Sequence, residues 1–393
     1  MIFLYSILFL PSVTFGILNA EIFPWGVIVC LLLNVRYDSK SILIIFLMFI
    51  SAISSLLLLP SNYSHIEVFR SLAAYLNALL PFILVINLES KELQRLRKVI
   101  LWLFYFLVTL GFLQYFHLIN FLDPLFKFFI PRASAESLSF MNRGATLLSS
   151  EPARAGVELI FMYVVVRYTS IRKTLISDAL MLIYILFIIQ SAMALGCYMV
   201  FLLIIYRLRL VLILAVILLL ITQINLHSGG RAIDLVYKVI GSSSIYDSLY
   251  MVMNVSGARV ISIYSSFIYG IHNIFGGGIG CWKISSVDAL NMTGFDVGSM
   301  RYFQVHGAGS VVPVRSSGFF SNLMLDVGWL GVLMFSFYLY DKLKVYWKNG
   351  TESRNLILYF IFNVCVIGSV GDPTPWIVIA LMLRIFDYGR NKV

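Results

Sequence analysis

The run LISDALMLIYILFIIQSAMALGCYMVFLLIIY, residues 175–206, carries one charged side chain, Asp178, in an otherwise largely apolar stretch. A single helix crosses a bilayer with about 20 apolar residues. Because this run is much longer than one crossing needs, the sequence predicts two membrane helices here, divided near Ser191.

The rest of the chain has the same character. The 393 residues are 60% hydrophobic, 15% aromatic and 12% charged, whereas charged residues make up about 25% of a soluble domain. Ten further apolar runs lie at 2–19, 22–36, 41–59, 70–88, 99–120, 155–169, 208–225, 319–340, 355–370 and 374–388. With the two halves of the opening run they predict an all-α, polytopic membrane protein of about twelve transmembrane helices, with residues 1–393 as a single integral membrane domain.

The basic residues orient these helices, since Lys and Arg are retained on the cytoplasmic side. A cytoplasmic N-terminus puts most of them inside, among them Arg36, Lys40, Lys342 and Lys344, and it also puts the C-terminus inside. Topology then accounts for the net charge of +10. The inner loops are too short for a nucleic-acid-binding domain, so we expect no nucleic-acid partner.

Two long intervals fall on the outer side, at 121–154 and 226–318. The second is far longer than an ordinary connection, and such loops are usually functional or disordered. It contains apolar residues at helical spacing between Val260 and Ile271, which predict a helix lying on the membrane surface and ended by Gly276 to Gly278. We therefore expect a large, partly helical external loop.

Arginine outnumbers lysine in these two loops. The arginines are Arg132, Arg143, Arg154, Arg231, Arg259, Arg301 and Arg315, and the lysines are Lys127, Lys238 and Lys283. Guanidinium offers planar, bidentate donors that suit phosphate oxygens, which an ammonium group does not. The pattern favours a phosphate binder, and the alternative is that these arginines pair with external acids or with lipid head groups.

The stretch SSEPARAGVE, residues 149–158, places charges where a membrane helix begins. Pro152 suits a first helical turn, and Glu151, Arg154 and Glu158 then share one helix face. Charges at membrane depth persist when they are paired or when they act on something. The sequence leaves both interpretations open: an ion pair that starts the helix, or an acid and an arginine facing a polar cavity.

Two more candidates lie around the predicted helix 319–340. Asp326 is four residues after Asn322 within this helix, and a buried carboxylate there needs a partner or a proton. His306 and Arg315 shortly precede it, and histidine is the side chain best suited to proton transfer near neutral pH. The sequence has no metal-binding or nucleotide-binding motif, so we expect an activity without metal or cofactor.

These residues lie in segments that resemble the O-antigen polymerases, a family of membrane glycosyltransferases related to the O-antigen ligases. The resemblance covers nearly the whole chain as architecture. Its more specific part rests on RGATLLSSEPARAG (143–156), SGARVISIY (256–264), IFGGGIGCW (274–282) and VHGAGSVVPVRSSGFFSNLMLDVGWLGVLMF (305–335).

The resemblance implies an inner-membrane enzyme that joins undecaprenyl-pyrophosphate-linked oligosaccharide units on the outer face, with 226–318 as a periplasmic loop. It suggests that arginines hold the pyrophosphates, and a chain-length regulator is a conceivable partner. The candidate substrate-binding residues are Arg143, Arg154, Arg231, Arg259, Arg315 and Asp326, and the candidate acid–base residues are Glu151 and His306. Two alternatives stay open: an O-antigen ligase that passes the glycan to lipid A core, and a transporter of lipid-linked sugar.

Overall fold

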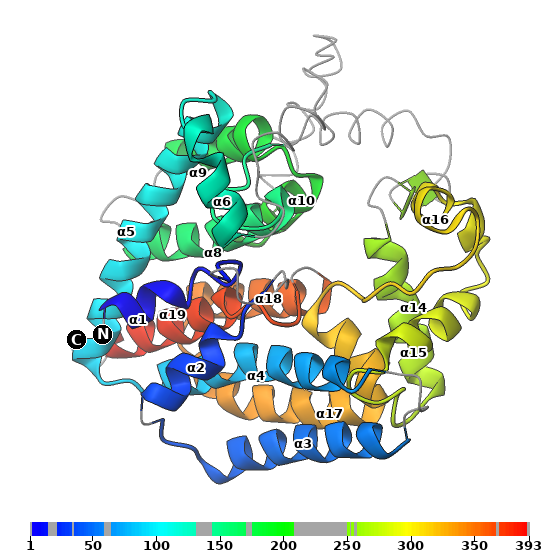
Figure 1. Ribbon diagram of the computed structural model, residues 1–393. Coiled ribbons are helices and arrows are strands. Elements are labelled where there is room, and N and C mark those ends of the chain that lie inside the picture. Colours follow the sequence, from blue (N-terminus) through cyan, green and yellow to red (C-terminus); the bar gives the residue numbers. More distant parts are fainter. Residues whose placement is uncertain are drawn as a thin grey trace. The chain divides into compact units, whose positions relative to one another are not determined.

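Figure 1 shows a computed structural model of the protein. It describes residues 2–14, 22–33, 35–58, 64–130, 144–169, 175–207, 250–251, 253–254, 258–366 and 369–390. Throughout these ranges the chain forms helices and connecting segments and no strand, as the all-α prediction requires. The chain divides into two compact units. Unit 1 comprises Met1–Trp25, Leu88–Gly241 and Pro373–Val393, and unit 2 comprises Gly26–Asn87 and Ser242–Asp372.

Unit 1 is built around α8 (Pro152–Thr169), whose side chains are buried on all sides. This helix packs against α5 (Ser90–Tyr115), α10 (Ala192–Tyr206) and α19 (Thr374–Arg390), while α1 (Ile2–Ile7) packs against α5. A helix that is apolar all round belongs in the interior of a protein. Burial of α8 therefore explains its apolar run at 159–166 without requiring contact with lipid.

The opening run of the sequence is divided where the prediction put the break. Helix α9 (Leu175–Tyr184) continues as the π-helix η2 (Ile185–Ile189), and Gln190 then adopts a left-handed conformation with φ of 52°. The Ser191 hydroxyl accepts a hydrogen bond from the Ala194 amide at 3.3 Å and caps α10. Serine is a favoured residue at this capping position, so the division near Ser191 is confirmed.

An irregular segment, residues 144–150, is buried beside this break. The Ala145 amide donates to the Ile188 carbonyl at 2.8 Å. The Gln114 side chain on α5 meets both backbone groups of Leu147, at 2.8 and 2.9 Å. Buried backbone groups must be paired, and the Gln114 side-chain amide supplies the hydrogen bonds that a helix or strand would otherwise provide to Leu147.

Unit 2 contains α3 (Ser39–Leu58), which packs against α4 (Ile66–Ile86) and α17 (Phe319–Trp347) (Figure 1). Helix α17 also contacts α18 (Thr351–Val366), α14 (Arg259–His272) and α15 (Trp282–Asn291). The unit further includes α2 (Trp25–Leu32) from Gly26 on, η3 (Val297–Ser299) and α16 (Arg301–Gly307). Buried Asn77 on α4 ties distant segments together, since it accepts from the Gly26 amide at 2.6 Å and donates to the Gly371 carbonyl at 2.6 Å.

Helix α17 reverses direction at Gly328. The φ of 68° and ψ of −173° at this residue belong to a region that only glycine occupies readily. The rings of Phe319 and Phe335 lie 5.0 Å apart, whereas an uninterrupted helix would separate these positions by about 24 Å. The segment before Gly328 therefore folds back onto the segment after it. The prediction of an apolar helix at 319–340 is therefore right in position, but the helix is interrupted at Gly328 and is not continuous.

Within the described ranges, four helices are long and apolar enough to cross a membrane: Ser39–Leu57, Ile66–Ile86, Ser90–Tyr115 and Phe319–Trp347. They coincide in position with four predicted spans, although the last of them is interrupted at Gly328. Leu175–Ile189 and Ala192–Tyr206 are shorter apolar helices. The protein thus has transmembrane character, but twelve spans are not confirmed. Among the described residues of the first two predicted spans, the helical ones are Ile2–Ile7 and Trp25–Leu32, and 208–225 lies outside the described residues.

The predicted outer loops are partly described. In 121–154 the chain forms η1 (Asn120–Leu122), α6 (Asp123–Phe129) and the irregular segment. In 226–318, α14 confirms the predicted helix, although it ends at His272 and not at the glycines. Helices α14, α15 and α16 share a small core that includes Ile261, Leu290 and Phe303.

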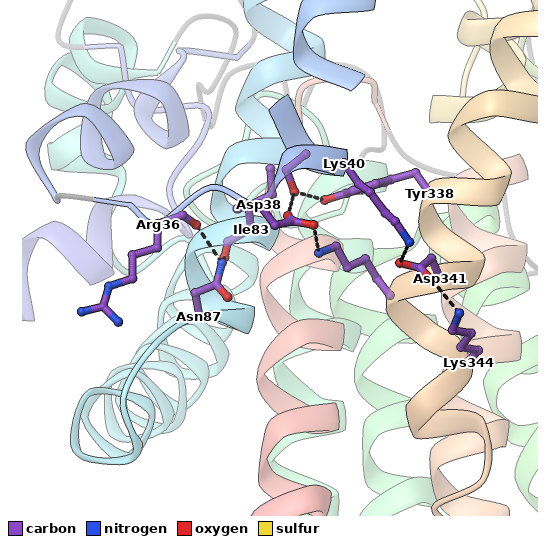
Figure 2. A network of polar contacts seen from close by, with 10 residues as sticks. Arg36, Asp38, Lys40, Ile83, Asn87, Tyr338, Asp341 and Lys344 are labelled. Carbon is purple, nitrogen blue, oxygen red and sulfur yellow. Dashed lines mark hydrogen bonds and ion pairs between the residues drawn. The ribbon is translucent and has the colours of Figure 1, made fainter. Parts of the chain in front are cut away.

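Charged side chains join the start of α3 to the last turns of α17 (Figure 2). Lys342 donates to Asp38 at 2.8 Å, and Asp341 accepts from Lys40 at 2.7 Å and from Lys344 at 2.6 Å. Lys40, Lys342 and Lys344 were all assigned to the cytoplasmic side from the sequence. Their meeting at one end of unit 2 is what that assignment requires, and we call the five bonded residues the inner charge network.

Candidate functional site

Asp326 is the most deeply buried of the predicted site residues. Its side chain is 0% exposed and accepts a hydrogen bond from the Tyr75 hydroxyl on α4 at 2.7 Å. The Tyr75 ring packs edge-on against Phe319, with ring centroids 5.3 Å apart. The carboxylate therefore has a fixed partner on another helix, as the sequence required of any carboxylate at this depth.

Arg315 lies just before α17 and close to this carboxylate. Its Nε donates to the Asn322 side chain at 3.3 Å, and its positive charge acts on both Asp326 and Tyr75. Asn322 in turn donates to the carbonyls of Ser316 and Gly318 at 2.5 and 2.7 Å. The result is a chain of polar groups that positions the guanidinium beside the buried acid.

Two polar atoms of this group are unsatisfied within the protein. Among the described residues, Arg315 Nη2 and Asp326 Oδ1 are buried and have no hydrogen-bond partner. Leaving a buried polar atom unpaired costs about 1–3 kcal/mol, more for a charged group. One of these atoms is a donor and the other an acceptor, and a hydroxyl group, which both accepts and donates, has the chemistry to pair with either.

The segment after α14, residues 273–280, fills the reversal of α17. The Gly277 amide donates to the Leu325 carbonyl at 2.8 Å and the Gly278 amide to the Asp326 carbonyl at 2.7 Å. A Cβ at Gly276 would lie 2.5 Å from the Gly328 nitrogen, so only glycine permits this approach. We call this segment the glycine loop, and its backbone holds Asp326 in place.

Cys281 follows the glycine loop directly. Burial raises the pKa of its thiol above the usual value, so the thiol is kept protonated at neutral pH. Because the thiolate is the nucleophilic form, Cys281 has the surroundings of a structural cysteine.

Arg259 begins α14, on the side where the chain approaches Arg315. The Ser316 hydroxyl donates to the Ser262 carbonyl at 3.2 Å, and the Ser262 hydroxyl donates to the Arg259 carbonyl at 2.8 Å. The segments that carry the two arginines therefore adjoin. Further along, a Cβ at Gly270 would lie 2.6 Å from the Met324 carbonyl, so α14 runs parallel to the first segment of α17.

His306 lies on the short helix α16 and is exposed. Its ring packs against Tyr302, with ring centroids 4.6 Å apart. This aromatic contact is its one interaction within the described residues. Nothing in its surroundings sets it apart from a surface histidine, so its catalytic role stays a prediction.

The unit 1 candidates surround the start of α8. Glu151 immediately precedes the helix and is partly exposed, and Arg154 donates to the Ser150 hydroxyl at 3.0 Å. Glu158 is buried one turn further on and accepts from Ser149 at 2.5 Å. Ser149 and Ser150, from the buried segment 144–150, thus hydrogen-bond to Glu158 and Arg154 of the predicted group.

The candidates divide between the two units. Unit 2 brings Asp326, Arg315 and the start of α14 together and leaves His306 on its surface, and unit 1 holds Glu151 and Arg154. Arg143 and Arg231 lie outside the described residues.

Sequence reasoning missed Tyr75. It lies 251 residues from Asp326, and a tyrosine within an apolar run is unremarkable. The weak available signal was its position two residues before another polar residue, Asn77, in a predicted span. Comparison of the chain with protein-family models, curated proteins and solved structures found no significant match.

Proposed function

We propose that the protein is a membrane glycosyltransferase of the O-antigen polymerase type. It would join undecaprenyl-pyrophosphate-linked oligosaccharide units on the outer face of the inner membrane. The observation that carries the proposal is the buried Tyr75–Asp326 pair beside Arg315, at the opposite end of the second α17 segment from the inner charge network. An acid, an arginine and open polar atoms at one helix end suit a substrate that is both a sugar and a phosphate.

The arginines would stabilise the leaving group. In the transfer, an acceptor hydroxyl attacks the anomeric carbon, the bond from that carbon to the phosphate oxygen breaks, and the pyrophosphate departs with the electron pair. A cation about 4 Å from the developing charge contributes roughly 4 kcal/mol at an effective dielectric of 20, before desolvation is subtracted. Arg315 and Arg259 are the candidates in unit 2, since their segments adjoin.

The proton of the acceptor hydroxyl needs a base. Glu151 and His306 remain the candidates, because each is a titratable group with access to solvent. Asp326 is better suited to orienting Arg315 and binding a hydroxyl through Oδ1, since its other oxygen is held by Tyr75. A hydrogen bond in a buried site stabilises a complex more than the same bond in water. Buried Asp326 is therefore suited to binding and orienting groups, and the solvent-accessible Glu151 or His306 to accepting the proton.

Cells deleted for the gene and carrying variants would test the proposal. We expect Arg315→Lys and Arg259→Lys each to remove long-chain surface polysaccharide from a gel ladder, with normal protein abundance by immunoblot, because lysine keeps the charge but loses the planar fork. Arg301→Lys is the matched control, since Arg301 is exposed and has no assigned role. Full ladders from both variants would contradict a bidentate phosphate clamp.

A transporter is the second candidate, and the reversal of α17 favours it. Interrupted helices with buried polar residues often form substrate sites in transporters. Purified protein in liposomes separates the two functions, because transport moves labelled lipid-linked sugar across the membrane and polymerisation lengthens the glycan.

The deletion strain separates a polymerase from a ligase. One repeat unit on each lipid A core indicates a lost polymerase, and a core without any unit indicates a lost ligase.

A further inference from the structure

Apolar side chains are exposed around the glycine loop. Ile271 is 61% exposed, Ile274 47%, Phe275 74% and Ile284 44%. They cluster at the end of α14, in the loop and at the start of α15, and we call these four residues the loop patch. These four residues lie close together in the chain, on either side of the glycines, and a large exposed apolar patch marks a surface that contacts something other than water.

The loop patch is continuous with helices of membrane-spanning character. A Cβ at Gly278 would lie 2.5 Å from the Ser55 hydroxyl on α3, and one at Gly280 would lie 2.5 Å from Val68 on α4. The nearby end of α3 exposes Leu57 at 80%. The patch thus extends the apolar faces of helices whose length and composition suit a bilayer.

The depth of the loop follows from the helix rise. About 20 Å of helix separates Gly328 from Asp341 in the inner charge network, at 1.5 Å per residue. The hydrocarbon core of a bilayer is about 30 Å thick. If the network lies at the inner boundary and the segment runs along the bilayer normal, the glycine loop lies below the outer boundary, at the depth of the outer-leaflet acyl chains.

The loop backbone meets the demand that this depth imposes. Hydrocarbon offers no hydrogen bonds, so irregular backbone is tolerated there only when its polar groups are paired within the protein. The Gly276 amide donates to the Asn273 carbonyl at 3.1 Å, and the Leu330 amide donates to the Ile274 carbonyl at 3.4 Å. The Gly277 and Gly278 amides also donate hydrogen bonds to α17 carbonyls. The backbone groups of the glycine loop are thus paired with those of α17 on both sides of Gly328.

The nearby charges also suit this position. Lys283 pairs with Glu67 at 3.1 Å and lies 5.7 Å from the Trp282 ring. Lysine and tryptophan are common at the boundary between hydrocarbon and water, where long side chains can reach the polar region.

From the exposure, the depth and the paired backbone, we infer that the glycine loop is a re-entrant membrane segment whose loop patch contacts the acyl chains of outer-leaflet bilayer lipids. This inference does not depend on the reaction that the protein catalyses. It identifies a lipid-contact surface within the predicted outer loop 226–318.

Spin labels in lipid nanodiscs would test it. Single cysteines replace Phe275, Phe337 and Val305, which are exposed at 74%, 70% and 69% respectively. Phe337 lies on the second segment of α17 and is the lipid-facing control, and Val305 on α16 is the water-facing control. The native cysteines are buried or half-buried, so the unsubstituted protein measures background labelling.

The measurement compares collisions with oxygen, which concentrates in hydrocarbon, and with a polar nickel complex, which is excluded from it. We expect the oxygen-to-nickel ratio at residue 275 to match that at 337 and to exceed that at 305 by at least about fivefold. A ratio at 275 equal to that at 305 would overturn the inference. So would a label at 275 that neither reagent reaches, because protein would then cover the patch. If Phe275→Cys does not fold, Ile274→Cys is read against the same controls.

Discussion

Replacing Gly328 by alanine tests whether the reversal of α17 is essential to unit 2. A Cβ at this position would lie 2.3 Å from the carbonyl oxygens of both Asn273 and Ile274 and 2.5 Å from the Gly276 nitrogen. All three contacts are with backbone, which cannot rotate away as a side chain can. The backbone conformation itself costs a non-glycine residue about 1–3 kcal/mol, and the overlaps add to this. We expect a loss of at least about 3 kcal/mol, a large part of the stability of a domain.

The assay is the fraction of detergent-solubilised protein that remains monodisperse in size-exclusion chromatography after heating through a series of temperatures. Gly328→Ala should lose monodispersity at clearly lower temperature than the wild type. Gly196→Ala is the control, because Gly196 lies within α10 and a Cβ there meets nothing within 4 Å. Alanine in a helix interior is favoured over glycine by about 0.5–1 kcal/mol, so this variant should be unchanged or slightly more stable. If the two variants are equally stable, the tight junction between loop and α17 is refuted.

Three further changes probe other contacts. Tyr75→Phe keeps the ring but removes the hydrogen bond to Asp326, so we expect polysaccharide chains to shorten while protein abundance stays normal; a full ladder would argue against a role for this pair. Asn77→Leu leaves backbone groups unpaired in the core of unit 2, at about 1–3 kcal/mol for each group, and should lower heat resistance in the same assay. Asp38→Asn tests the inner charge network: burial raises the pKa of Asp38, but hydrogen bonds from Lys342 and Ser41 outweigh burial and lower the pKa overall. The ionised carboxylate therefore stabilises the fold above the unfolded pKa of about 4, and this contribution is lost as the pH falls through the lower folded value. Because the Asp38 side chain is 42% exposed, the wild type should exceed the variant by under about 1 kcal/mol at pH 7, and the difference should shrink as the pH falls below the unfolded pKa of about 4. A difference that stays constant throughout an acid titration would rule out the ionised pair as its source.

The sequence by itself determined the helical class, the membrane character and several helix positions. These properties are local: apolar runs of sufficient length predict helices such as α3, α4 and α5 without knowledge of their neighbours. The division near Ser191 was predictable for the same reason, since a run of fixed length and a serine cap are both read along the chain. The charge pattern likewise grouped Lys40 and Lys342 on one side before the network that contains them was known.

Only the tertiary structure decided what the polar residues in these helices contact. The reversal at Gly328 was not predictable, because the apolar run continues through it and glycine is common in membrane helices. Its cause is the glycine loop, about fifty residues earlier in the chain, whose backbone replaces the hydrogen bonds that the interruption removes. The pairing of Tyr75 with Asp326 is equally non-local. A sequence shows that a buried carboxylate requires a partner, but the choice of partner depends on which helices pack side by side, and packing is settled by the complementarity of whole surfaces.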